Sequence, residues 1–233
     1  MLAPVFSTLV FFVFVVSETT VFGNDDIKRI LNKYRSIDTV SKVLVIETNK
    51  KHKEIDQNKW DEIKSLAKAH LYVKDKNKDW SAVFENEVAY IGKNGPGKTK
   101  EGDQKTPLGE FNFLKAFGIK PEPEGTILPY IEITDNIYAC DGEFSEYYNQ
   151  IIDKSRVAHE CKGHGEHMIE FKPSYNYGLT IDFNKENDPK KGSNIFLHCF
   201  GNHPYTGGCV AVNEKKMEYL LKQIDNNCKF CII

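Results

Sequence analysis

A histidine and a cysteine near the C-terminal end of the chain have the residue types and the spacing of a nucleophilic catalytic pair. An apolar run at residues 195–198 ends in His198, and a Gly-Gly turn further along delivers Cys209 into a second apolar run. A thiol becomes a strong nucleophile when a nearby imidazole takes its proton, and Gly207 and Gly208 leave backbone N–H groups open to an incoming carbonyl. The segment therefore favours cysteine acyl transfer, although buried cysteines and histidines in packing roles are common.

The composition indicates a globular protein. The chain has 233 residues, of which 40% are hydrophobic and 27% are charged, and its formal net charge is −2. This length suits one good-sized domain or two small ones. A near-neutral charge without a basic stripe argues against nucleic acid as the main partner.

The N-terminal residues predict a secretory signal peptide. Residues 5–16 form a continuous apolar run, short for a membrane span but typical of a signal sequence, and Gly23 suits the position before a cleavage site. We therefore expect residues 1–23 to be removed and residues 24–233 to form one secreted domain that is free of the membrane. An uncleaved anchor is the alternative, and the absence of Lys or Arg before the run is a departure from the signal pattern.

Six cysteines matter in an exported protein because disulfides form in an oxidising compartment. They are Cys140, Cys161, Cys199, Cys209, Cys228 and Cys231. A nucleophilic Cys209 must stay reduced, and Cys199, next to His198 on a strand, should face the opposite side as a buried free thiol. The other four allow three connectivities, of which Cys140–Cys161 with Cys228–Cys231 is the most local.

The periodicity of apolar residues predicts a mainly β domain with a few flanking helices, an α+β fold. Helical spacing is found over residues 25–37, 58–70 and 214–224, and apolar strands are found over residues 42–48, 111–114, 130–133, 179–183 and 195–198. From residue 71 to residue 95, short runs separated by Asn, Asp and Gly predict a hairpin. We found no internal repeat or long linker, so we expect a single domain with the N-terminal elements packed onto it.

Several segments, in order along the chain, resemble the YkuD-like L,D-transpeptidases. Residues 101–111 read EGDQKTPLGEF, a Gly- and Pro-rich turn leading into a strand, and they resemble the GDGKTPxGxF stretch of that family. Residues 192–211 resemble its catalytic GSxIFLH…TxGCVA segment. Together with shorter matches between them, the resemblance runs from residue 42 to residue 224 and covers nearly all of the expected mature chain.

The resemblance implies a β-sandwich or barrel catalytic domain that acts on peptidoglycan stem peptides and needs no cofactor or metal. Members of the family attack the amide between the L-centre of the diamino acid and the terminal D-alanine of a tetrapeptide stem. They release D-alanine, hold the acyl group as a thioester and pass it to an amine on a neighbouring stem. The implied partners are a tetrapeptide donor and an amine acceptor.

The resemblance also implies a role for each residue of the catalytic segment. Cys209 matches the nucleophile, and His198 matches the general base and acid. The backbone N–H groups of Gly208 and Cys209 match the oxyanion donors. Thr206 and Gly207 occupy the turn whose backbone carbonyl is expected to orient the imidazole.

Two positions depart from the family pattern. Much of the family has His where this chain has Gly207, and Arg or Asn is common where this chain has Ala211. A cation at the second position would hold a substrate carboxylate. The group that anchors the substrate is therefore unassigned in the sequence.

Three other readings stay open. Three histidines and Cys161 lie within residues 159–167, which suggests a metal site, but their spacing fits no standard zinc pattern. The same cysteine site could pass the acyl group to water, as a cell-wall carboxypeptidase or amidase. The chain could also be a non-catalytic, secreted wall-binding protein on a retained scaffold.

Overall fold

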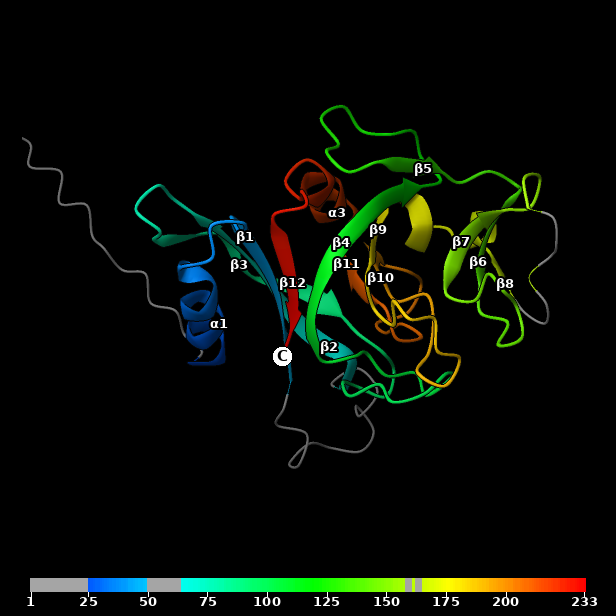
Figure 1. Ribbon diagram of the computed structural model, residues 1–233, viewed down its shortest axis with the longest axis horizontal. Coiled ribbons are helices and arrows are strands. Elements are labelled where there is room, and N and C mark those ends of the chain that lie inside the picture. Colours follow the sequence, from blue (N-terminus) through cyan, green and yellow to red (C-terminus); the bar gives the residue numbers. More distant parts are fainter. Residues whose placement is uncertain (1–24, 50–63, 158–160, 162–164) are drawn as a thin grey trace, which may run out of the picture.

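The computed structural model describes residues 25–49, 64–157, 161 and 165–233, in which nine strands form one mixed sheet (Figure 1). The strand order is β12-β1-β2-β3-β11-β10-β9-β4-β5, and β12 also pairs with β4, so eight strands close into a barrel with β5 as an extra strand on β4. The barrel strands are β1 (Lys42–Thr48), β2 (Leu66–Lys74), β3 (Trp80–Tyr90), β4 (Gly109–Gly118), β9 (Gly178–Ile181), β10 (Phe196–Cys199), β11 (Val210–Val212) and β12 (Cys228–Ile232), and β5 is Tyr130–Glu132. Closure removes the exposed sheet edges that an open sheet would leave.

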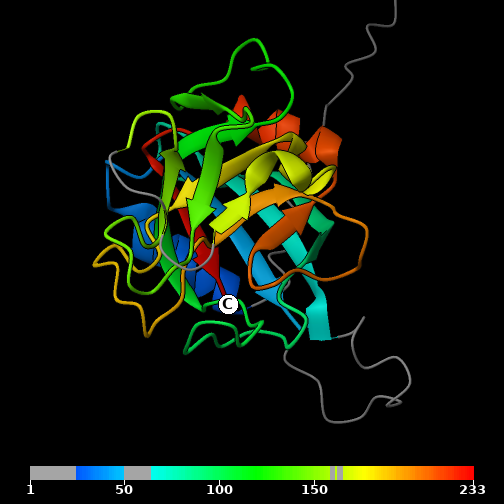
Figure 2. The same ribbon diagram turned by 90° about the vertical axis from the view of Figure 1, so that its right-hand side faces the viewer.

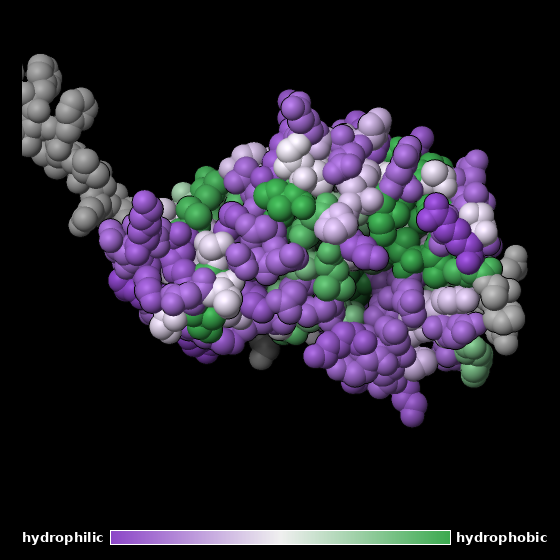
Figure 3. Space-filling model, turned by 45° about the horizontal axis from the view of Figure 1, so that its top comes forward, coloured by the Kyte–Doolittle hydropathy of each residue, from purple (hydrophilic) through white to green (hydrophobic). Residues whose placement is uncertain are grey.

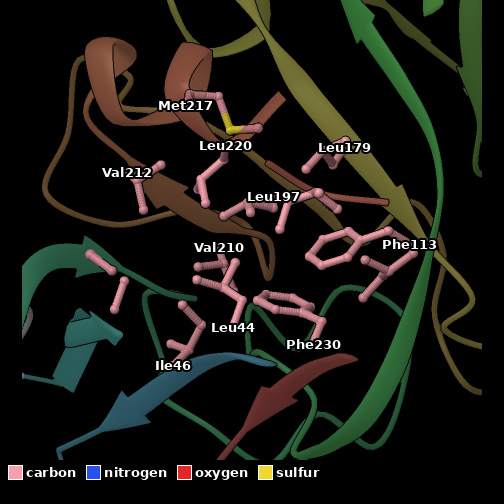
Figure 4. Packing of buried hydrophobic residues seen from close by; sticks show 14 of the residues in the cluster. Leu44, Ile46, Phe113, Leu179, Leu197, Val210, Val212, Met217, Leu220 and Phe230 are labelled. Carbon is pink, nitrogen blue, oxygen red and sulfur yellow. The ribbon is translucent and has the colours of Figure 1, made fainter. Parts of the chain in front are cut away.

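The interior of the barrel holds the main hydrophobic core. Aliphatic and aromatic side chains from most of its strands meet there with Met217 and Leu220 of helix α3 (Glu214–Leu221), as Figure 4 shows. Asn213 begins this helix as its N-cap, because its side-chain oxygen accepts the Lys216 N–H at 2.8 Å. The core residues labelled in the figure are Leu44, Ile46, Phe113, Leu179, Leu197, Val210, Val212, Met217, Leu220 and Phe230.

A second, smaller core lies between the outside of the barrel and helix α1 (Asp25–Arg35). The helix buries one face, formed by Ile27, Ile30, Leu31 and Tyr34. Against it lie Val43 and Val45, which alternate along β1 with the inward-facing Leu44 and Ile46. Strand β1 is therefore covered on both sides, which explains why it reads as a continuous apolar run.

A three-stranded sheet forms the end of the molecule opposite α1 (Figures 1 and 2). Its strands are β6 (Ile137–Cys140), β7 (Gln150–Asp153) and β8 (Gly165–His167), in the order β7-β6-β8. The disulfide Cys140–Cys161 ties β6 to the segment before β8. Short 3₁₀ turns, η2 (Met168–Glu170) and η3 (Ser174–Asn176), lead the chain back to the barrel.

The mainly β fold with flanking helices is confirmed, and so are the N-terminal and C-terminal helices. Of the helix expected over residues 58–70, residues 64 and 65 are helical, but the prediction is wrong for residues 66–70. Residues 66–70 belong to strand β2, which pairs with β1 on one side and β3 on the other. Ala67, Ala69 and Leu71 point into the barrel core with the period of two that a strand requires. Pairing on both sides outweighs a local helical pattern.

The cysteine pairing is confirmed in one half and wrong in the other. Cys140 and Cys161 are bonded, whereas Cys228 and Cys231 are both buried free thiols. The odd spacing on strand β12 places Cys228 in the barrel core and Cys231 in the core beneath α1. Side chains on opposite faces of a strand cannot be bridged without moving the backbone.

Figure 3 shows a surface made mainly of hydrophilic residues, with apolar residues gathered in patches among them. In the part of the chain that the structure describes, no helix is both long and apolar enough to cross a membrane. The predicted signal peptide over residues 1–23 lies outside the described residues.

Candidate active site

The parallel pairing of β10 and β11 brings the histidine and the cysteine to one face of the barrel wall. His198 is opposite Ala211 in this pairing, and Cys209 directly precedes β11. Side chains two residues apart on a strand share a face, so Cys209, Ala211 and His198 all point away from the barrel core. Cys199 points the other way, into the core, as a buried free thiol that donates to the Tyr177 carbonyl at 3.4 Å.

The imidazole of His198 is held in one tautomer. Its Nδ1 lies 2.7 Å from the backbone carbonyl of Cys199, and because a carbonyl can only accept, Nδ1 carries the proton. The lone pair is then on Nε2, the atom available as a base. The ring of Tyr175 packs edge-to-face against the imidazole with centroids 5.5 Å apart, which fixes the ring plane.

The orienting carbonyl is therefore not the one expected from the Thr206–Gly207 turn. The carbonyl of Thr206 accepts the Lys93 N–H at 2.9 Å, and the Thr206 N–H donates to Ile91. Both backbone groups of Thr206 are used in joining its turn to the segment after β3. The imidazole takes the carbonyl of its own neighbour on β10 instead.

The thiol of Cys209 is bound to backbone groups on the neighbouring segment. Its Sγ donates to the Asn194 carbonyl at 3.2 Å and accepts the Phe196 N–H at 3.2 Å. Among the described residues, no hydrogen bond joins this thiol to the imidazole. The thiol proton must therefore leave the Asn194 carbonyl before His198 can take it.

Both members of the pair are neutral in the resting protein. Burial, followed by the nearby Glu166 carboxyl, raises the pKa of Cys209 to about 12. Burial also lowers the pKa of His198 to about 4. A thiolate–imidazolium pair is thus not the resting state, and the chemistry of the site is general-base transfer of the thiol proton during attack.

This neutral state predicts slow, pH-dependent alkylation of Cys209. Cys209 is 9% exposed, more than the other free cysteines of the described chain, so iodoacetamide should label it first. Because only the thiolate reacts, the rate should rise about tenfold for each pH unit between about pH 7 and about pH 9.5. The rate would be followed by mass spectrometry, and a plateau below about pH 8 would show that the thiol is already activated.

The Gly-Gly turn before the nucleophile supplies only part of the expected oxyanion site. The Gly208 N–H donates to the Thr206 hydroxyl at 3.1 Å, because a threonine side chain readily closes such a turn on itself. Of the two N–H groups expected to bind the oxyanion, the Cys209 N–H is the one that remains available in this state. Gly208 has a φ of +146°, and a Cβ there would lie 2.9 Å from the Lys105 carbonyl, so the turn requires glycine.

Thr106 connects the nucleophile turn to the rest of the barrel, a role that the sequence reasoning missed. Its buried hydroxyl accepts the Gly92 N–H at 2.8 Å and donates to the Gly208 carbonyl at 2.7 Å. Thr106 stands in the GDQKTPLG stretch, so the resemblance marked the position without its function. The distant Gly- and Pro-rich loop thus holds the turn that carries Cys209.

A cavity of about 320 Å³ opens over the pair, and both Cys209 and His198 line it. Glu166 of β8 contributes to its wall and accepts a hydrogen bond from the Tyr175 hydroxyl at 2.6 Å. Burial raises the pKa of this carboxyl. The small sheet therefore closes one side of the site, and its residues connect to His198 through Tyr175.

The residues of the alternative metal reading are only partly described. Cys161 is in the disulfide, which removes it as a thiolate ligand, and His159 and His164 lie outside the described residues. His167 lies 2.9 Å from Glu170 and 2.9 Å from the Asp135 carbonyl. Among the described residues, no group of three possible ligands is assembled.

A comparison with protein families matches residues 62–232 to the YkuD L,D-transpeptidase catalytic domain. The match contains every strand of the barrel except β1, together with the whole cysteine and histidine site. A search of curated proteins gave no match. The closed mixed barrel is consistent with this family, whose members are cell-wall enzymes. The chain therefore belongs to the YkuD L,D-transpeptidase family.

Proposed function

We propose that the protein is a secreted cysteine acyltransferase that acts on the tetrapeptide stems of peptidoglycan. The observation that carries the proposal is the imidazole of His198, fixed by the Cys199 carbonyl with Nε2 unprotonated, in the same cavity as the Cys209 thiol. A peptide substrate for this site follows from the family, whose substrates are peptidoglycan peptides. The apolar N-terminal run supports secretion.

The reaction begins with proton transfer from the Cys209 thiol to Nε2 of His198 as the sulfur attacks the carbonyl carbon of the diamino acid. A C–S bond forms, and the negative charge on the carbonyl oxygen is stabilised by the Cys209 N–H. The C–N bond to D-alanine then breaks, and the imidazolium returns its proton to the leaving amine. A thioester remains, and D-alanine departs.

The acyl group then passes to an amine of a second stem. The incoming amine forms a C–N bond, the C–S bond breaks, and His198 carries the surplus proton from the amine to the sulfur. Water in place of the amine would give a hydrolase with the same first half-reaction. The donor half of the site is shared by both outcomes.

The direct test is intact-protein mass spectrometry after mixing with a purified tetrapeptide stem. The expected result is a mass increase equal to the stem minus D-alanine, mapped by peptide analysis to Cys209. The Cys209→Ala variant should gain no mass. Cys199→Ala is the matched control, because that thiol points into the barrel core, and it should still form the adduct.

The fate of the adduct separates the remaining functions. Product analysis with and without an added amine should show cross-linked peptide with the amine present if the protein is a transferase. Hydrolysed tripeptide in both cases identifies a carboxypeptidase. Absence of any adduct, together with no reaction with a carbapenem, contradicts the proposal and leaves the non-catalytic wall-binding protein.

A further inference from the structure

We propose that Lys98 and Asn194 form a subsite for the terminal carboxylate of the donor stem, beside the scissile amide. The subsite takes over the task that a cation after the cysteine performs elsewhere in the family. It rests on the proposed function, because a stem that ends in a free D-alanine is the ligand. Both residues line the cavity that contains Cys209 and His198.

Lys98 brings a buried positive charge to the cavity. Its side chain is 2% exposed, and its Nζ lies 3.1 Å from Asp103. Burying an ammonium group is costly unless it is paired or binds an anion. The charge also acts on the nucleophile, since it is among the influences that lower the pKa of Cys209 against the larger effect of burial.

Asp103 is the ion partner of Lys98, but its carboxylate also accepts three backbone hydrogen bonds. Its two oxygens also accept the backbone N–H groups of Thr99, Lys100 and Lys105 at 2.8 to 3.1 Å. Three such donors stabilise a carboxylate strongly. The aspartate therefore orders the loop and aims Lys98, and the ammonium keeps donor capacity for a second anion.

The segment from Gly192 to Asn194 makes room for the lysine and adds a second donor. Gly192 has a φ of +101°, and a Cβ there would lie 2.2 Å from the Lys98 Cε, so the stem of the lysine lies directly against this glycine. Two residues on, Asn194 is 7% exposed, and neither atom of its carboxamide has a hydrogen-bond partner among the described residues. A buried amide without partners is costly, and a carboxylate oxygen would satisfy its N–H₂ group.

The need for such a subsite follows from Ala211. This residue is opposite His198 in the strand pairing and is 2% exposed, so the position offers only a methyl group. Glu101 also lines the cavity, but its carboxylate accepts hydrogen bonds from the hydroxyls of Tyr148 at 2.8 Å and Ser193 at 2.7 Å. The Glu101 carboxylate would repel a substrate carboxylate, whereas the Lys98 ammonium would attract it.

The experiment compares two donors, a tetrapeptide that ends in D-alanine and the same peptide with a C-terminal carboxamide. Acylation rates would be measured by mass spectrometry for the wild type and for Lys98→Met. The wild type should favour the carboxylate about 10-fold to 100-fold, the range typical of a charge-assisted hydrogen bond. Lys98→Met should lose that preference, so that its rates on the two donors become nearly equal.

Lys100→Met is the matched control, because that side chain is exposed on the same loop and only its backbone N–H meets Asp103. It should keep the wild-type preference. Asn194→Gly, which tolerates the φ of +51° at this position, should reduce the preference without removing it. Binding of the D-alanine peptide to Cys209→Ala, with and without Lys98→Met, would be measured by calorimetry and should weaken by a similar factor.

The outcomes separate the subsite from the function. Equal wild-type rates on both donors, or a faster rate on the carboxamide, overturn the subsite and leave the acyl transfer intact. An equal loss on both donors in Lys98→Met, with thermal unfolding unchanged, assigns the lysine a structural role instead. If the wild type forms no adduct with either donor, the proposed function fails, and the subsite fails with it.

Discussion

His198→Asn is expected to slow acylation of Cys209 by about 10³-fold to 10⁴-fold. The wild-type thiol has a pKa of about 12, so its attack depends on a base that takes the proton during the reaction. Asparagine keeps a polar group near the Cys199 carbonyl but offers no basic nitrogen. The rate would be obtained from the appearance of the acyl adduct by intact mass.

The pH profile distinguishes lost base catalysis from a disturbed fold. The wild-type kcat/KM should fall only as the pH drops toward about 4, because the imidazole must be neutral to act and burial lowers the pKa of His198 to that value. An ordinary histidine would give this limb near pH 6.5. In His198→Asn the rate should instead rise steadily with pH, as the thiolate forms without help. A wild-type limb near pH 6.5, or a flat profile in the variant, would contradict the neutral pair.

The sequence predicts correctly those elements whose local apolar pattern agrees with their packing in the fold. Strand β1 is a continuous apolar run, and the two helices have apolar residues at helical spacing. The observed packing follows both patterns. Residues 66–70 carry a helical pattern but lie between two strands, and pairing decides their structure. Cys228 and Cys231 look like a local disulfide, and only their assignment to β12 shows that they face opposite cores.

The features of the site also divide into those that the sequence predicts and those that it does not. Residue types, their order and the resemblance of the surrounding segments identify Cys209 and His198. They do not identify the carbonyl that orients the imidazole or the hydroxyl that occupies the Gly208 N–H, since both depend on backbone geometry. Nor do they predict the sign of the thiol pKa shift, which follows from burial beside Glu166.

Thr106→Val is expected to lower the free energy of unfolding by about 2–5 kcal/mol, which corresponds to a fall in Tm of about 5–15 °C. Valine has nearly the shape of threonine but leaves the Gly92 N–H and the Gly208 carbonyl without the hydroxyl that joins them. Thr106 is fully buried, so water does not replace the lost bonds at low cost. Thermal and urea unfolding would measure the change.

The same variant should also acylate about 10-fold to 100-fold more slowly at a temperature where it is folded, because a small shift of the Gly208–Cys209 turn misplaces both the sulfur and the Cys209 N–H. Thr106→Ser keeps the hydroxyl and should recover most of the rate. Thr126→Val, whose hydroxyl donates only to the nearby Pro123 carbonyl, is the matched control and should change neither quantity much. If Thr106→Val unfolds and acylates like the wild type, the nucleophile turn is held by its own strand pairing and the hydroxyl bridge is dispensable. Loss of rate without loss of stability would instead show that the bridge serves the geometry of the site alone.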